Sequence, residues 1–154
     1  MSLFVKSILS LALLFGTGMA CAAATVFDAD EVQATGLTKE QARQILALVL
    51  KHKHYDLSMP GMLVNDDLSS ANGISPHPGY IDFNVVYTSS TAGLDDYDGL
   101  FVVSPATGDI WELNDCTHFV YADLKHVQEL IMQRTGKTLA GEVAQRSMLG
   151  CTNE

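Results

Sequence analysis

The sequence predicts an α+β domain: an N-terminal amphipathic helix packed on a three- or four-stranded antiparallel sheet, followed by C-terminal helices and tied by one disulfide. Three observations predict this class. Apolar residues recur at helical spacing after Thr38, apolar and polar residues alternate from residue 80 to 89, and two apolar runs flank a turn within Gly99–Leu113.

An export leader precedes the domain. Lys6 supplies a positive charge, and Ile8–Phe15 is an apolar run. Small residues then form a signal-peptide cleavage site between Ala22 and Ala24. The run is too short to span a membrane, and no later segment approaches that length. We expect a signal peptide over residues 1–22, a flexible lead-in over 23–36 and one domain over 37–154.

Two alternatives to a cleaved leader stay open. The apolar run could be retained as an N-terminal anchor. Cys21 could instead carry a lipid, although Gly18 stands where a lipobox normally has leucine. A freely soluble exported protein is the interpretation that we favour.

The composition limits the partners and the redox state. The formal net charge is −9, and cleavage would remove only the positive Lys6, so nucleic acid and anionic membranes are poor partners and a basic protein is a better one. Cys116 and Cys151 remain after the leader, an even number that predicts a disulfide in an oxidising compartment. The alternative is that Cys116 is a nucleophile with His118 as its base. Two residues that are two positions apart on one strand point the same way without making good contact, so we favour the disulfide.

The first helix is expected over residues 39–54. Thr38 and Gln41 can form a capping box, and Leu37 stands where a hydrophobic staple would. The apolar stripe consists of Ala42, Ile45, Leu46 and Val49.

Strands are expected next. Met62–Val64 forms a short one, and Tyr80–Ser89 alternates most cleanly, with Ile81, Phe83, Val85 and Tyr87 on one face. In the Gly99–Leu113 hairpin, Pro105 presets a turn and Gly108 allows a positive φ. Trp111, the single tryptophan, is the expected anchor of the core.

Helices close the chain. One begins near Ala122 or Asp123 and stops at Gly136, burying Leu124, Val127, Leu130 and Ile131. A last short helix, Leu139–Met148, carries Cys151 back towards Cys116.

Each candidate catalytic or metal-binding motif in the sequence is incomplete. The acidic stretch before Gly99 resembles a calcium loop, but Leu94 and Pro105 occupy two ligand positions. The phosphate-loop-like stretch Thr135–Thr138 lacks its earlier glycine, and the remaining histidines are scattered. We therefore expect no enzyme activity, no metal and no cofactor.

Acidic loops beside aromatic and methionine side chains are the candidate partner-binding surface. They could be steered by charge into a basic cleft and held there by burial. The alternatives are that the loops only keep the protein soluble and that the methionines fill the core edge. The candidate residues are Met59, Met62, Asp66, Asp67, Asp95, Asp96, Tyr97 and Asp98.

The leader, the N-terminal helix, the hairpin with Thr107-Gly108-Asp109-Ile110-Trp111 and the two later cysteines together resemble small periplasmic immunity proteins. These proteins protect bacteria from type VI secretion peptidoglycan-amidase effectors. Similar Thr-Gly hairpins occur in PepSY-like and cystatin-like modules. The resemblance implies a periplasmic inhibitor that occludes the active site of a cell-wall hydrolase. The alternative is a PepSY-like structural or ligand-binding module, and an exposed strand edge would also permit a homodimer.

Overall fold

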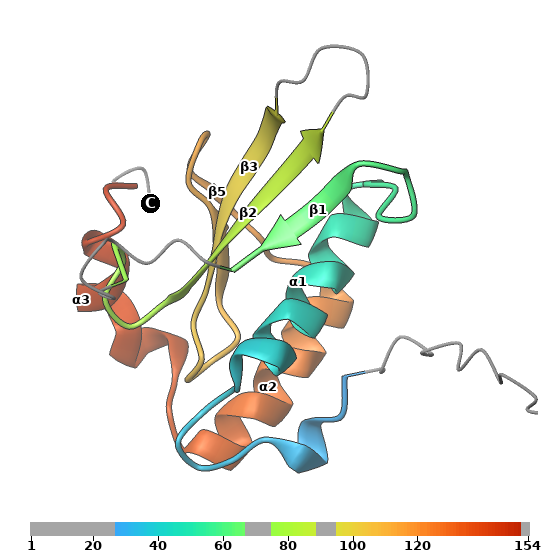
Figure 1. The fold of residues 1–154 in the computed structure, drawn as a ribbon. Helices are drawn as coiled ribbons and strands as arrows, with labels where there is room; N and C mark the ends of the chain where they lie inside the picture. Colours follow the sequence, from blue (N-terminus) through green and yellow to red (C-terminus); the bar gives the residue numbers. More distant parts are fainter. Residues whose placement is uncertain (1–26, 67–74, 89–94, 152–154) are drawn as a thin grey trace, which may run out of the picture.

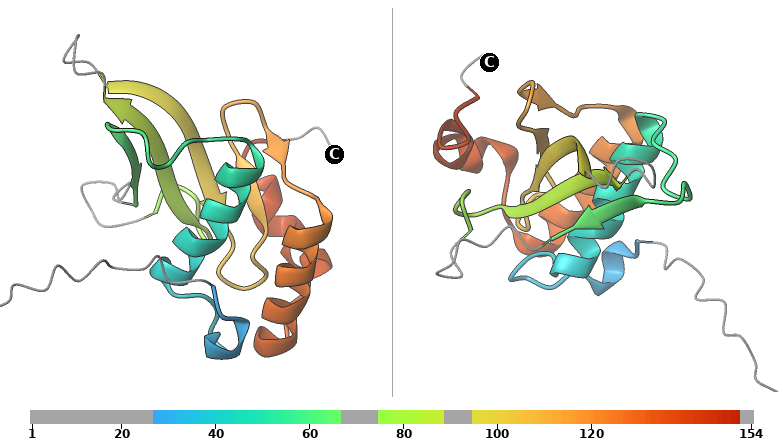
Figure 2. Two further views of the ribbon diagram at one scale, coloured as in Figure 1. Left: turned by 90° about the vertical axis from the view of Figure 1, so that its right-hand side faces the viewer. Right: turned by 45° about the horizontal axis from the view of Figure 1, so that its top comes forward.

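Two helices cover one face of a five-stranded antiparallel sheet in the computed structural model (Figures 1 and 2). The model describes residues 27–66, 75–88 and 95–151. The predicted leader, Cys21 and Asp67 lie outside these residues, as does Leu94. No helix within the described ranges is long and apolar enough to cross a membrane.

The strands follow one another across the sheet in chain order, β1-β2-β3-β4-β5. The elements are η1 (Ala29–Glu31), α1 (Lys39–His52), β1 (Met62–Asn65), β2 (Ile81–Thr88), β3 (Asp95–Val103), β4 (Ile110–Glu112), β5 (Thr117–His118), α2 (Ala122–Thr135), η2 (Leu139–Glu142) and α3 (Val143–Ser147).

Helix α1 begins with the predicted capping box. The Thr38 hydroxyl accepts from the Gln41 backbone N–H at 3.2 Å, and the Gln41 side chain accepts from the Thr38 N–H at 2.9 Å. The helix ends at His52, two residues before the predicted end, because His54 adopts a left-handed conformation with φ of 64°.

Helix α2 ends at Gly136, which has φ of 68°, as expected. Its buried face differs from the predicted stripe. Gln128 is buried there and donates its side-chain amide to the Gly108 carbonyl at 3.0 Å, whereas Val127 and Leu130 are only partly buried. A buried polar residue that bonds backbone is invisible to a search for apolar periodicity.

The expected lead-in is packed from Phe27 onward. The 3-10 turn η1 is followed by Val32, which is 5% exposed and joins the main core, and the Asp30 carboxylate pairs with Arg134 of α2. These contacts attach the start of the domain to the second helix.

The sheet has one more strand than predicted, because the two-residue β5 pairs with β4. The second difference concerns Asp95–Asp98, which were expected in a loop. They lie in β3, where Asp95 is paired with Thr88. Alternating apolar residues could not reveal this part of the strand, since three of these four residues are aspartates.

The main core lies between the sheet and the two long helices. Phe83, Val85 and Phe101 meet Ile45 and Leu46 there, all fully buried. A smaller apolar cluster occupies the other face of the sheet and contains Tyr80, Val102, Trp111 and Leu149. Trp111 therefore anchors the cover formed by the C-terminal segment.

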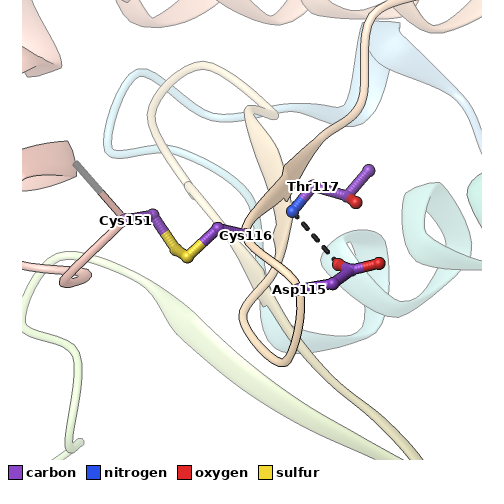
Figure 3. Close-up of a disulfide and its surroundings, with 4 residues drawn as sticks. All are labelled: Asp115, Cys116, Thr117 and Cys151. Carbon is purple, nitrogen blue, oxygen red and sulfur yellow. Dashed lines mark hydrogen bonds between the residues drawn. A yellow bond between two sulfur atoms is a disulfide. The ribbon is translucent and has the colours of Figure 1, made fainter. Parts of the chain in front are cut away.

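The C-terminal segment, predicted as one helix over residues 139–148, is divided into the 3-10 turn η2 and the short helix α3. Cys151 follows it and forms the predicted disulfide with Cys116, with a Cα–Cα distance of 5.3 Å (Figure 3). Cys116 has φ of 54°, and beside it the Asp115 carboxylate accepts from the Thr117 N–H at 3.2 Å.

Candidate functional site

The hairpin motif Thr107–Trp111 is built into a buried polar cluster. Asp109 is fully buried and accepts from the Trp111 indole N–H at 3.0 Å. Its carboxylate also contacts His118 Nε2 at 2.7 Å and Arg146 Nε at 3.2 Å. Asp109 thus joins β4, β5 and α3 at one point.

A second buried carboxylate completes this cluster. Glu142 accepts from the Ser104 hydroxyl at 2.6 Å and from the Thr107 hydroxyl at 2.7 Å. The two carboxylates hold the C-terminal segment against the hairpin. Because they are enclosed, the motif supports the fold and is not a surface that a partner can reach.

A Ser-His-Asp group elsewhere also lacks catalytic geometry. The Ser75 hydroxyl and the His77 ring both hydrogen-bond to the buried Asp82 carboxylate. A nucleophilic serine would instead be bonded to the histidine that removes its proton. Within the described residues no group of three or more histidine, cysteine, aspartate or glutamate side chains could hold a metal ion.

A further feature is the distal part of the β2–β3 pair, which we call the arm. The two strands pair from Ile81–Val103 to Thr88–Asp95, whereas β4 pairs with β3 only over Phe101–Val103. The far half of β3 therefore has β2 on one side and no strand on the other among the described strands. On its other side, β2 pairs with β1 from Tyr87–Met62 to Asn84–Asn65, so the edge without a strand beside it belongs to β3. Figure 1 shows β2 and β3 side by side, with β1 next to β2.

A β-bulge lies at the base of the arm, between the proximal and distal parts of the β2–β3 pair. Val85 is paired with Gly99 but Val86 with Tyr97, so Asp98 is the extra residue. A Cβ at Gly99 would lie 2.7 Å from Phe101 Cε2 and 3.1 Å from Glu112 Oε1. The glycine thus lets the ring and the carboxylate approach the backbone at the base of the arm.

Lys53 supports this base from the end of α1. Its ammonium pairs with the nearly buried Glu112 carboxylate and lies 5.4 to 5.9 Å from the ring centroids of Tyr55, Phe101 and Phe119. Burial lowers the pKa of Lys53, but the hydrogen bond and charge of Glu112 outweigh it and raise the pKa above its usual value. Lys53 therefore keeps its positive charge at neutral pH.

The structure brings only some of the candidate residues together. Asp95, Asp96, Tyr97 and Asp98 are consecutive in the distal part of β3. Met62 begins β1 in register with Tyr87, near the same end of the sheet, and packs against the main core.

The other candidates lie apart from the arm. Met59 is 37% exposed in the loop before β1. Asp66 follows the opposite end of β1, where its carboxylate is 2.7 Å from Arg43 Nη2 and 3.9 Å from Lys39 Nζ. Burial raises the pKa of Asp66, but the hydrogen bond and charge of Arg43, aided by Lys39, hold it below its usual value. Asp66 is therefore already paired within the molecule.

One feature escaped sequence reasoning altogether, a groove between α1 and α2. Its lining comes from two stretches of the chain, residues 27–52 and 121–127. The lining residues are Phe27, Leu48, Lys51, His52, Tyr121, Asp123, His126 and Val127. The signal that could have indicated it is the basic run Lys51–His54, whose simplest interpretation is a solvated helix end.

Comparison with known proteins gives the family. The model of the family "T6SS, Immunity protein Tgi2PP" matches residues 36–143. The solved "Structure of a type VI secretion system effector-immunity complex from Pseudomonas protegens" contains a chain with 46% identity and a TM-score of 0.79; the match covers 82% of this chain and 99% of that one. No curated protein matches. The chain therefore belongs to the Tgi2PP family of type VI secretion immunity proteins, which are non-enzymatic inhibitors.

Proposed function

We propose that this immunity protein is exported to the periplasm, binds a cell-wall hydrolase effector and blocks the effector's active-site cleft with the β2–β3 arm. An effector as the partner is suggested by the similar chain, which was solved in an effector–immunity complex. The disulfide favours an oxidising compartment such as the periplasm.

The observation that carries the proposal is the distal end of the β2–β3 pair, whose β3 edge has no strand beside it among the described strands. A paired strand segment is already ordered, so inserting it into a cleft costs less conformational entropy than inserting a flexible loop. Three aspartates in its β3 half add negative charge, which would accelerate association with a cleft rich in Lys or Arg. The Lys53–Glu112 pair and the bulge at Gly99 fix the direction of the arm.

The amidase class of the target stays a prediction, because it derives from the sequence resemblance alone. Purified peptidoglycan treated with the effector distinguishes the possibilities. An amidase releases stem peptides with new amino termini, whereas a glycosidase creates new reducing ends on the glycan. The immunity protein should suppress whichever product appears.

The proposal is tested with the mature protein and the product of the neighbouring gene. The two are expected to co-purify, and the immunity protein should abolish peptidoglycan cleavage at equimolar concentration. A variant carrying Asp95→Lys, Asp96→Lys and Asp98→Lys should associate about tenfold more slowly or worse. Glu31→Lys, Glu40→Lys and Glu129→Lys, at three exposed acids outside the arm, make the same change in net charge; this triple variant is the matched control and should bind normally.

Two results would contradict the proposal. If no cell-wall hydrolase is encoded nearby or retained on the protein, the target is wrong. If the complex forms and the arm variant inhibits as well as the control, the arm is not the blocking element.

A homodimer through the β1 edge also stays a prediction. The Arg43 guanidinium donates to the Val64 carbonyl at 2.6 Å, so α1 already occupies part of this edge strand. This contact opposes strand pairing between two copies. Light scattering across a concentration series tests the oligomeric state.

A further inference from the structure

The last part of the described chain, residues 143–151, ends in the disulfide (Figure 3). We call this part the cover. Leu149 is its one buried apolar side chain, and it packs in the small cluster with Tyr80, Val102 and Trp111 on the face of the sheet opposite α1 and α2. Among the described residues, the buried members of the main core include none from the cover, so this core can stay packed when the cover moves.

Glu142, immediately before the cover, is attached to the sheet by bonds of its own. Its buried carboxylate accepts from the Ser104 hydroxyl at 2.6 Å and from the Thr107 hydroxyl at 2.7 Å. Neither bond involves the cover. The helical segment is also interrupted here, because Glu142 has φ of −100° and ψ of 4° between η2 and α3. The junction between Glu142 and Val143 is therefore a hinge about which the cover can turn while η2 stays in place.

The ion pair of the cover can break without leaving a buried charge alone. Arg146 Nε lies 3.2 Å from the Asp109 carboxylate. If Arg146 moves into solvent, water hydrates its charge, and Asp109 keeps the Trp111 indole N–H and the His118 ring as partners. Movement of the cover therefore avoids the penalty of an uncompensated buried carboxylate.

The other half of the disulfide belongs to the sheet. Cys116 lies in the turn between β4 and β5, two strands that pair with each other. Beside it, the Asp115 carboxylate accepts from the Thr117 N–H at 3.2 Å. None of these bonds involves the cover, so the turn can keep its shape when the disulfide is broken.

We propose that the Cys116–Cys151 disulfide is a redox latch: the cover lies on the sheet when the bond is present and moves away when it is reduced, with the main core folded in both states. Ordering the cover costs conformational entropy at every residue, which one buried leucine and one ion pair do not offset. The disulfide keeps the end of the cover beside the sheet and so gives Leu149 and Arg146 a high effective concentration at their contacts. The latch therefore closes in an oxidising compartment and opens in a reducing one.

The opening step is thiol–disulfide exchange with a dithiol. One thiolate of the dithiol attacks a sulfur of the protein disulfide, and its second thiol then displaces that sulfur to form a cyclic disulfide. The protein S–S bond breaks, and two electrons and two protons pass from the dithiol to Cys116 and Cys151, which become thiols. Closing is the reverse exchange, in which glutathione disulfide takes the two electrons and two protons and leaves as two glutathione thiols.

The test compares the oxidised mature protein with the same protein reduced by dithiothreitol. Trp111 is the single tryptophan and is 3% exposed beside Leu149, so its fluorescence reports on the cover. Reduction should raise the acrylamide quenching constant about twofold or more and speed hydrogen exchange in residues 143–149, whereas α1, β2 and β3 should stay protected. Oxidised glutathione should reverse both changes.

The matched control is the double variant Cys116→Ser with Cys151→Ser, which should resemble the reduced protein and show no response to dithiothreitol. Unchanged quenching and exchange on reduction would show that non-covalent contacts alone hold the cover, and would overturn the proposal. Lost protection throughout α1, β2 and β3 would also overturn it, because the disulfide would then maintain the whole fold. No readout involves the effector, so failure of the proposed inhibition leaves this test unaffected.

Discussion

Replacing Asp109 by alanine should destabilise the domain more than any exposed charge change. The carboxylate is fully buried and has three partners, the Trp111 indole, His118 and Arg146. Removing one member of a buried ion pair leaves the other charge uncompensated, which costs about 3–5 kcal/mol. A domain has only about 5–15 kcal/mol of stability, so this loss is a large share of the total.

Urea unfolding with the disulfide intact measures this loss. Asp115→Ala is the control, because that exposed carboxylate accepts a single backbone hydrogen bond, a contact that contributes about 1 kcal/mol. Arg146→Leu completes a double-mutant cycle with Asp109→Ala, in which the double variant should lose less than the sum of the single ones. A loss below about 1 kcal/mol for Asp109→Ala, or strict additivity, would refute the role of the cluster.

Three further changes test the scaffold. Arg43→Gln should lower stability more at neutral pH than in acid. The Asp66 pKa is depressed in the folded state, so the stability from this pair is present above the unfolded-state pKa and disappears as pH falls through the folded-state one, whereas the Arg43 hydrogen bond to the Val64 carbonyl is lost at either pH. Urea unfolding measures the stability at each pH, and equal losses of stability at both pH values would contradict this prediction. Reducing the disulfide should lower the free energy of unfolding by about 3–4 kcal/mol, measured from the shift of the urea transition. An unchanged transition would contradict a stabilising role for the disulfide. Gly36→Ala should lower the melting temperature more than Gly136→Ala, because both glycines have positive φ but only the first would place a Cβ 2.6 Å from the Pro105 carbonyl oxygen.

The local elements could be predicted because their signals are local. The capping box of Thr38 and Gln41, the alternation after Tyr80 and the stop at Gly136 each depend on residues within a few positions of one another. Periodicity and capping report this kind of information. The disulfide was predictable for another reason, since only two cysteines, Cys116 and Cys151, follow the predicted leader.

The buried carboxylates could not be predicted, because their partners are remote. Glu142 accepts from Ser104 and Thr107, which lie 38 and 35 positions earlier, and Asp109 meets Arg146 from the C-terminal segment. A single sequence does not show which charged residues the fold encloses. Similarly, the sequence predicts an acidic loop for the distal part of β3, because its pairing with β2 involves residues that are remote in the sequence.

The contrast between the two hairpins supports the proposal that the partner binds the β2–β3 hairpin. In the β3–β4 hairpin, the Thr107 hydroxyl and the Asp109 carboxylate are buried and bind side chains of the C-terminal segment. These polar groups are therefore not accessible to a partner. In the β2–β3 hairpin, the backbone of Asp95–Gly99 has no strand beside it on one side among the described strands, and the chain there is acidic. A partner can therefore bind the second hairpin without disrupting the fold, whereas any surface that used the first would have to displace buried ion pairs. This difference is why mutations in the first hairpin should act on stability and mutations in the second on association rate.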